Sequence, residues 1–275
     1  MIPSRFLICV DSSGTAFDTM NIKHTQAFIP AALEIWPMTG RVAERFADIE
    51  KAVNLFSSMR GINRYPGLLE VFDLLAAGFP GHPEIPDMTD LREFVVTETT
   101  YSYETLKKWV KAHPSKDLEK VLAWSERADA LFAEATKGLK PYPLVRESLE
   151  IAGRSATVAI VDGGTPEELS REWEESGREP FIDLMLSQAD GTTAAQLYKA
   201  RQKCREKASV LMIGDTESDG AAAHKVGALF YPILPGDEVT SWQRFHDVIL
   251  PLFLEGKYDR ETEEKYYGRL KKLLS

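Results

Sequence analysis

Four short stretches of the chain consist almost wholly of apolar residues, and each ends in a loop that carries Gly or Asp. They are residues 5–10, 156–161, 210–213 and 229–234. Continuous apolar runs of this length, rich in Val, Ile and Leu, are typical of strands that are covered on both faces. Helical patterns lie between the later runs. The sequence therefore predicts βαβ units and a parallel sheet.

Residues from about 20 to 140 show a different pattern. Apolar residues recur there at helical spacing, and Gly and Pro interrupt the pattern at 78–86 and 140–143. The helical segments are 41–59, 65–78, 103–113 and 117–136, and two more, 241–256 and 260–274, follow the last apolar run. We therefore predict an α/β fold with a helical insertion after the first strand, which forms a second domain.

Composition and charge argue against several classes of protein. The formal charge of −9 argues against a broad nucleic-acid surface, because phosphate backbones are bound by Lys and Arg. No apolar run approaches the ~20 residues that span a bilayer, and the N-terminus has no signal-peptide pattern. Cys9 and Cys204 are too few and too far apart for a disulfide scaffold. We expect a cytoplasmic protein, monomeric or homodimeric, with no nucleic-acid or membrane partner.

Aspartates follow three of the apolar runs. Asp11 and Asp162 come directly after a run, and Asp215 follows "MIG" at the end of another. Parallel sheets bind ligands beyond the carboxyl ends of their strands, so we expect these side chains on one edge. Carboxylates brought together there would suit Mg²⁺, which prefers oxygen ligands. The alternative for Asp215 and Asp219 is a turn or a helix cap; we favour the metal site because Gly-Asp follows an apolar strand.

Two stretches resemble motifs of the haloacid dehalogenase-like hydrolase superfamily, in the right order along the chain. They are "VDSSGTAFDTM" at 10–20 and "VLMIGDTESDGAAAHKVGALFYPI" at 210–233. The resemblance implies a Rossmann-like, doubly wound parallel sheet core formed by residues 1–19 and 140–275, with an all-helical cap domain, residues 20–139, inserted after the first strand. It also implies phosphatase-type hydrolysis of a small phosphorylated metabolite, with Mg²⁺ as the cofactor.

The resemblance further implies roles for individual residues. Asp11 attacks phosphorus and forms an aspartyl-phosphate that water hydrolyses. The backbone carbonyl of Ser13 binds the metal together with Asp11 and Asp215. Asp219 binds metal-bound water or orients the loop. The remaining expected site residues are Thr15 and Asp162, which orient the site, and Gly163, Thr193, Arg60 and Lys23, which contact phosphate or substrate.

Two positions depart from the superfamily pattern in the residue they carry. Ser13 stands where phosphatases have an aspartate that acts as general acid and base, and without such a group the rate falls by about 10² to 10⁴. Asp162 stands where a Ser or Thr normally hydrogen-bonds phosphate. Thr165 is not a replacement, because Pro166 and Glu168 after it predict a capping box at the start of a helix.

The third departure is a missing lysine before the last motif, where Thr192 and Thr193 stand. Lys199 lies about 9 to 10 Å further along a helix, and we expect a solvated charge there. Four aspartates then face the cation alone, which disfavours a phosphate dianion. The candidate compensating cations are Lys23, His24, Arg60 and Arg64. We favour Arg60, and the alternative for each is packing within the cap or surface charge.

These departures leave the activity open between two hypotheses. The first is an active Mg²⁺-dependent hydrolase, and the second is a catalytically impaired binding or regulatory protein that keeps the fold. Dehalogenation, a third reading, is disfavoured because it needs no divalent metal, whereas the acidic loop at 214–219 suits one.

Overall fold

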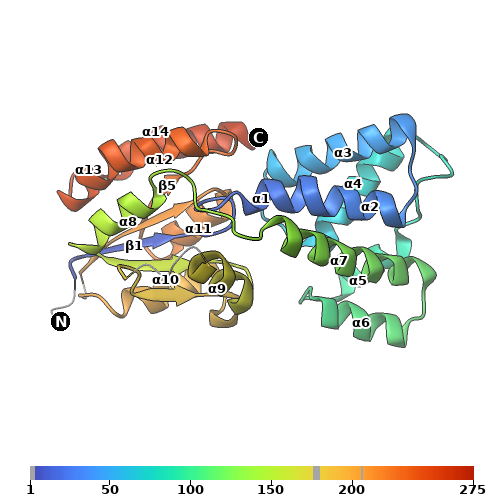
Figure 1. Ribbon diagram of the computed structural model, residues 1–275, viewed down its shortest axis with the longest axis horizontal. Helices are drawn as coiled ribbons and strands as arrows, with labels where there is room; N and C mark the ends of the chain where they lie inside the picture. The colour runs from blue at the N-terminus through green and yellow to red at the C-terminus, as the bar shows by residue number, and fades with distance from the viewer. Residues whose placement is uncertain (1–3, 176–179, 206) are drawn as a thin grey trace. The chain divides into compact units, whose positions relative to one another are not determined.

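The computed structural model describes residues 4–175, 180–205 and 207–275. The chain divides into two compact units. Residues 1–19 and 138–275 form the first, which we call the core unit, and residues 20–137 form the second, which we call the helical unit. Figure 1 shows the elements of both units. That the helical unit acts as a cap stays a prediction.

The core unit contains a five-stranded sheet in which every pair of neighbours is parallel, in the order β3-β2-β1-β4-β5. Its strands are β1 (Phe6–Val10), β2 (Thr157–Val161), β3 (Leu184–Leu186), β4 (Ser209–Gly214) and β5 (Leu229–Pro232). The register places Ile8 of β1 opposite Val158 of β2 and Leu211 of β4. The α/β class and the parallel sheet are confirmed. We did not predict β3, which has three half-buried residues and, among the described strands, pairs only with β2.

Helices cover both faces of this sheet (Figure 1). They are α8 (Val145–Gly153), α9 (Pro166–Glu175), α10 (Thr193–Arg201), α11 (Glu217–Lys225), α12 (Glu238–Arg244), α13 (Leu250–Leu254) and α14 (Arg260–Leu273), with a π-helical turn at Phe245–Ile249. Ile8 and Val10 face one hydrophobic cluster with α8, α9, α12 and α13, and Leu7 and Cys9 face another with α10, α11 and α14. Side chains alternate along a strand, so a sheet covered on both sides needs the continuous apolar runs seen in the sequence.

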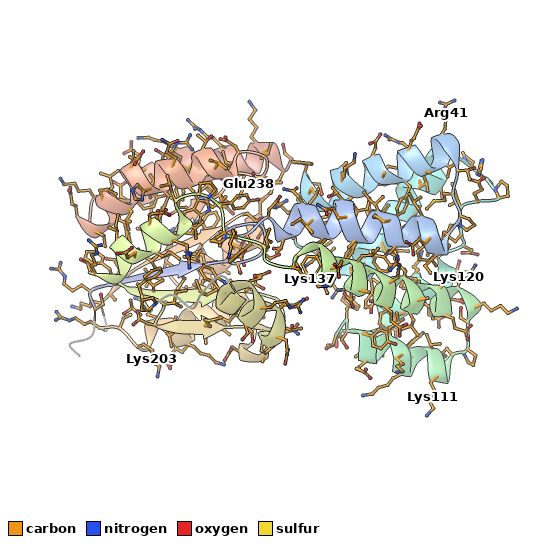
Figure 2. The ribbon with its side chains drawn as sticks, in the orientation of Figure 1. Arg41, Lys111, Lys120, Lys137, Lys203 and Glu238 are labelled. Carbon is orange, nitrogen blue, oxygen red and sulfur yellow. The ribbon has the colours of Figure 1, made fainter. Side chains whose placement is uncertain are left out.

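The helical unit has no strand in residues 20–137, all of which the structure describes. Its elements, starting at the unit boundary, are α1 (Thr19–Ile22), the π-helical η1 (Lys23–Phe28), α2 (Ile29–Ile35), α3 (Gly40–Leu55), α4 (Arg64–Gly78), α5 (Thr89–Thr97), α6 (Tyr103–Ala112) and α7 (Lys116–Ala135). Polar faces of these helices carry exposed cations such as Arg41, Lys111 and Lys120 (Figure 2). None of the helices in the described part of the chain is both long and apolar enough for a membrane crossing.

Candidate active site

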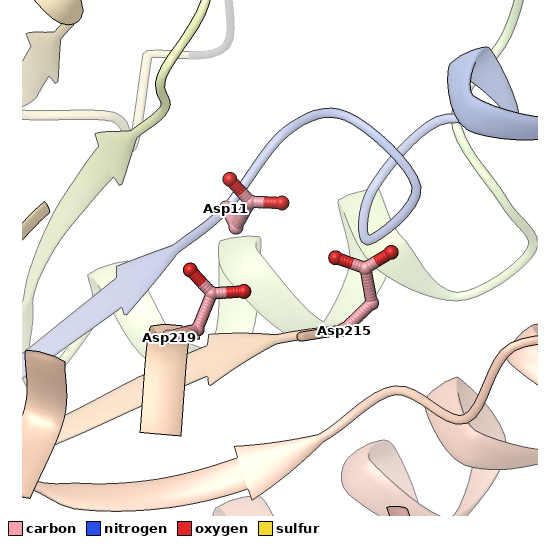
Figure 3. Close-up of side chains that lie close together, drawn as sticks. All are labelled: Asp11, Asp215 and Asp219. Atoms are coloured by element: carbon pink, nitrogen blue, oxygen red, sulfur yellow. The ribbon is translucent and has the colours of Figure 1, made fainter. Parts of the chain in front are cut away.

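Three carboxylates meet at the carboxyl end of the central strands. Oxygens of Asp11, Asp215 and Asp219 all lie within 4.8 Å of one another (Figure 3). The pairing of β1 with β4 brings them together, since Asp11 continues this ladder by donating its N–H to the carbonyl of Ile213 at 2.9 Å. Asp215 and Asp219 are buried, with 1% and 6% of their surface exposed. We call these three residues the acidic cluster.

The loop after β1 folds back on itself and carries a threonine to the acidic cluster. The carbonyl of Ser12 accepts the N–H groups of Ala16 and Phe17, and Gly14 adopts a φ of +82°, a conformation that favours glycine. The buried hydroxyl of Thr15 lies 2.9 Å from Oδ2 of Asp11 and 3.2 Å from Oδ1 of Asp215. Its single hydrogen can serve one carboxylate at a time, so Thr15 links the two acids.

The loop after β4 positions Asp219 by capping the next helix. Thr216 accepts the N–H of Asp219 at 3.1 Å, and Oδ2 of Asp219 accepts the backbone N–H of Thr216 at 3.2 Å, so the two form a capping box at the start of α11. Asp219 therefore caps a helix and also belongs to the acidic cluster. A side chain at Gly214 would bring its Cβ to 2.6 Å from Oδ2 of Asp219, so this position requires glycine.

Burial and mutual repulsion raise the proton affinity of the acidic cluster. Burial raises the pKa of Asp11 well above its usual range, and the charges of Asp162 and Asp219 add to this effect. Burial, followed by the charge of Asp215, raises the pKa of Asp219 to about 7. Carboxylates this close favour either protons or a cation. The donors are hard oxygens, so the residues present fit Mg²⁺.

Asp162 follows β2 and contacts the loop after β1. Its Oδ2 accepts the backbone N–H of Ser13 at 3.0 Å, and its Oδ1 accepts the backbone N–H of Gly164. Its side chain is buried, and its carbonyl accepts the amide of Gln196 at 2.9 Å. Backbone N–H groups that converge on one point, here from the loops after β1 and β2, can bind an anion. In this protein an internal carboxylate occupies both of them.

The other expected residues of the core unit lie in these loops or in α10. The hydroxyl of Ser13 accepts that of Thr19 at 2.8 Å. Gly163 is exposed beside Asp162, and Thr193 is the first residue of α10, half-buried. The predicted capping box is confirmed, because Thr165 and Glu168 exchange hydrogen bonds of 2.8 and 3.1 Å.

Lys199 is a surface charge, as we predicted. Its Nζ lies 3.2 Å from Oδ1 of Asp190, and half of its side chain is exposed. This pairing satisfies the lysine on the surface of the core unit, so it does not supply the cation that the superfamily pattern lacks here.

The four candidate cations of the helical unit all have contacts inside that unit. Arg60 is buried and donates to the carbonyl of Leu55 at 3.0 Å. Lys23 lies 5.3 Å from the ring of Phe132, Arg64 pairs with Asp129 at 2.7 Å, and His24 contacts Glu50 at 2.5 Å. These contacts correspond to the packing alternative given for each. A role for Arg60 or Lys23 at the acidic cluster stays a prediction.

One contact near the acidic cluster was missed by sequence reasoning. The buried hydroxyl of Ser12 donates to Glu172 at 2.5 Å and accepts the indole N–H of Trp173 at 2.9 Å. Both partners come from α9, about 160 residues away in the chain. Together they fix the residue next to Asp11. The sequence carries no local signal for this pairing beyond an acid and a tryptophan side by side in a helical segment.

No family model and no curated protein matches the sequence. Similar solved structures include a 2-haloacid dehalogenase from Pseudomonas syringae (19% identity over 84% of this chain and 86% of that one, TM-score 0.41). A haloacid dehalogenase-like family hydrolase from Streptococcus pneumoniae is also similar (17% identity, 88% and 91% covered, TM-score 0.43). A third is a predicted phosphoglycolate phosphatase from Haemophilus somnus (15% identity, 83% and 85% covered, TM-score 0.47).

Two of these three structures bear haloacid dehalogenase names. Likenesses with TM-scores below 0.5 say nothing about the chemistry of this chain.

Proposed function

We propose that the protein is a Mg²⁺-dependent hydrolase of the haloacid dehalogenase-like type that acts on a small phosphorylated metabolite. The observation that supports this function best is the acidic cluster, in which Asp11 follows the central strand and Asp215 and Asp219 follow its neighbour. A carboxylate within reach of two others at the carboxyl edge of a parallel sheet suits a nucleophile beside a cation.

Each residue of the site would have a distinct role in this reaction. Asp11, Asp215 and the carbonyl of Ser13 would hold Mg²⁺, which supplies positive charge for the negatively charged phosphoryl group. The Thr15 hydroxyl engages Oδ2 of Asp11, which leaves Oδ1 for attack. A bond from Oδ1 to phosphorus forms while the bond to the leaving oxygen breaks, and that oxygen takes a proton from water. The hydroxide that remains then attacks phosphorus of the aspartyl-phosphate, the bond from Oδ1 to phosphorus breaks, phosphate leaves, and Asp11 is regenerated.

A second candidate is a binding or regulatory protein that keeps this fold with little turnover. The contacts of Asp162 favour it. Its carboxylate occupies the N–H groups of Ser13 and Gly164 and adds a fourth negative charge close to Asp11. A phosphate dianion would have to displace this carboxylate or bind without those donors. Ser13 also offers no acid for the leaving group.

Turnover of phosphate esters distinguishes the two candidates. The purified chain with MgCl₂ is given a panel of small phosphate monoesters, and released phosphate is measured. We expect release by the unaltered chain and none by Asp11→Asn, while Asp237→Asn, an exposed aspartate at the start of α12, keeps full activity. Release that persists in Asp11→Asn would refute the nucleophile. If the unaltered chain binds Mg²⁺ but hydrolyses no ester, the second candidate holds.

A further inference from the structure

A small cavity lies inside the helical unit, separate from the acidic cluster. The volume of this cavity is about 10 Å³. Its walls come from η1, α3, α4 and α7, and they are formed by Phe28, Phe46, Glu50, Asn54, Arg64, Leu68, Val71 and Trp124. All of these residues belong to one unit, so the cavity does not depend on how the two units are arranged.

One wall of this cavity is a buried carboxylate with an unsatisfied oxygen. Glu50 is 3% exposed. Its Oε1 lies 2.5 Å from Nδ1 of His24 and 3.4 Å from the amide nitrogen of Asn54. Its Oε2 has no hydrogen-bond partner among the described residues. A buried carboxylate oxygen without a hydrogen-bond partner is costly, so this atom needs a donor that the described residues do not provide.

The other residues that line the cavity determine which kind of hydrogen-bond donor could bind beside Oε2 of Glu50. Phe28, Phe46 and Trp124 present aromatic rings, whose faces attract cations. Phe28 already lies 5.2 Å from the guanidinium of Arg64, whose own charge pairs with Asp129 at 2.7 Å. An anion would meet the Glu50 carboxylate, and a purely apolar group would leave Oε2 unsatisfied. A small cation with N–H donors satisfies both features.

Two features of the backbone shape this cavity: the π-helical turn η1 and the close contact between α3 and α4 at Gly67. His24 and Phe28 both lie on η1, and π-helical turns inside helices are frequent at functional sites. Gly67 of α4 lets the side-chain oxygen of Asn54 lie close to the α4 backbone, because a Cβ at position 67 would be only 2.8 Å from Oδ1 of Asn54. Asn54 is therefore held where its amide nitrogen can contact Glu50.

We propose that this cavity binds a primary ammonium group, with Oε2 of Glu50 as its acceptor and the rings of Phe28, Phe46 and Trp124 around it. The cavity volume of about 10 Å³ admits an ammonium group but no bulky substituent on it. The chemical class of ligand is thus a small primary amine in its protonated form, the dominant form at neutral pH. This binding does not depend on the proposed hydrolase activity.

Titration of the full chain with methylammonium chloride tests the proposal, with NaCl holding the ionic strength constant. The readouts are the thermal unfolding midpoint and the imidazole NMR signal of His24, assigned with His24→Gln. We expect saturable changes in both readouts. Glu50→Gln keeps an acceptor for His24 but replaces Oε2 by a donor, so binding should weaken at least tenfold. Glu44→Gln, an exposed glutamate on the same helix, should bind within twofold of the unaltered chain.

A second variant tests whether weaker binding by Glu50→Gln could come from misfolding and not from the loss of Oε2. Val71→Ile keeps every charge but adds a methyl group to the wall of the cavity, and it should also weaken methylammonium binding at least tenfold. Three results would overturn the proposal: no saturable response in the unaltered chain, equal affinity for methanol, or undiminished binding by Glu50→Gln.

Discussion

Replacing Asp162 by serine should open an anion site beside Asp11. In the present structure the carboxylate of Asp162 accepts the backbone N–H of Ser13 at 3.0 Å and that of Gly164. Serine has one short hydroxyl in place of the two carboxylate oxygens, so it cannot occupy both donors. We therefore expect Asp162→Ser to bind inorganic phosphate in the presence of MgCl₂ more tightly than the unaltered chain.

The size of the effect follows from the contacts that are released. A hydrogen bond to a charged acceptor contributes about 1.5 to 3 kcal/mol, so two freed N–H groups would supply about 3 kcal/mol at least. Removing one negative charge acts in the same direction, since two unit charges about 4 Å apart interact by about 4 kcal/mol at an effective dielectric constant of 20. Even the lower figure corresponds to about a 100-fold gain in phosphate affinity.

Isothermal titration calorimetry with inorganic phosphate measures this gain. The control is Glu167→Gln, which removes the same charge from an exposed position on α9 and should change phosphate affinity less than twofold. Circular dichroism establishes that each variant is folded. A folded Asp162→Ser protein that binds Mg²⁺ but binds phosphate no better than the unaltered chain would show that the two N–H groups are not an anion site.

Three further changes probe the acidic cluster. The pKa of Asp219 is about 7 against an ordinary 3.8, so the folded state binds this proton more tightly than the unfolded chain. Urea unfolding in EDTA should show about 4 kcal/mol of stability from Asp219 that is present below about pH 4 and lost as the pH rises through 7, and Asp219→Asn should reduce the measured loss, while the raised pKa of Asp11 keeps part of it. Gly214→Ala places a Cβ against Asp219 and should weaken Mg²⁺ binding at least tenfold by calorimetry, whereas Gly78→Ala, with open space around it, should not. Thr15→Val removes the hydroxyl between Asp11 and Asp215 and should lower stability in EDTA by about 1 to 3 kcal/mol, with a smaller loss when Mg²⁺ is present in a parallel denaturation.

The sheet could be predicted because its signal is local. A strand buried on both faces needs a continuous apolar run, and residues 6–10 and 209–214 have one. The meeting of Asp11 and Asp215 follows from the rule that parallel strands end on one edge. β3 escaped prediction because a three-residue edge strand with half-buried side chains carries too little pattern.

The contacts that tune the site could not be predicted in the same way. Asp162 meets the N–H of Ser13 across 149 residues, and Ser12 meets Glu172 across 160. Such pairs depend on sheet register and on the exact course of two loops, and neither leaves a periodic trace in the sequence. The unsatisfied oxygen of Glu50 likewise depends on how η1, α3, α4 and α7 pack, although the position of Glu50 on the buried face of α3 fits the helical spacing.

The central position of β1 has a consequence for synthesis of the protein. β1 leaves the ribosome before the other strands of this sheet, and its two partners, β2 and β4, begin only at residues 157 and 209. At about 5 to 20 residues per second, the roughly 200 residues between β1 and β4 take on the order of 10 to 40 s to translate. The helical unit is complete in the nascent chain well before then. Until β2 is made, the apolar segment "FLICV" has neither neighbour, and until β4 is made it has at most one, so this segment needs protection from aggregation in the newborn chain.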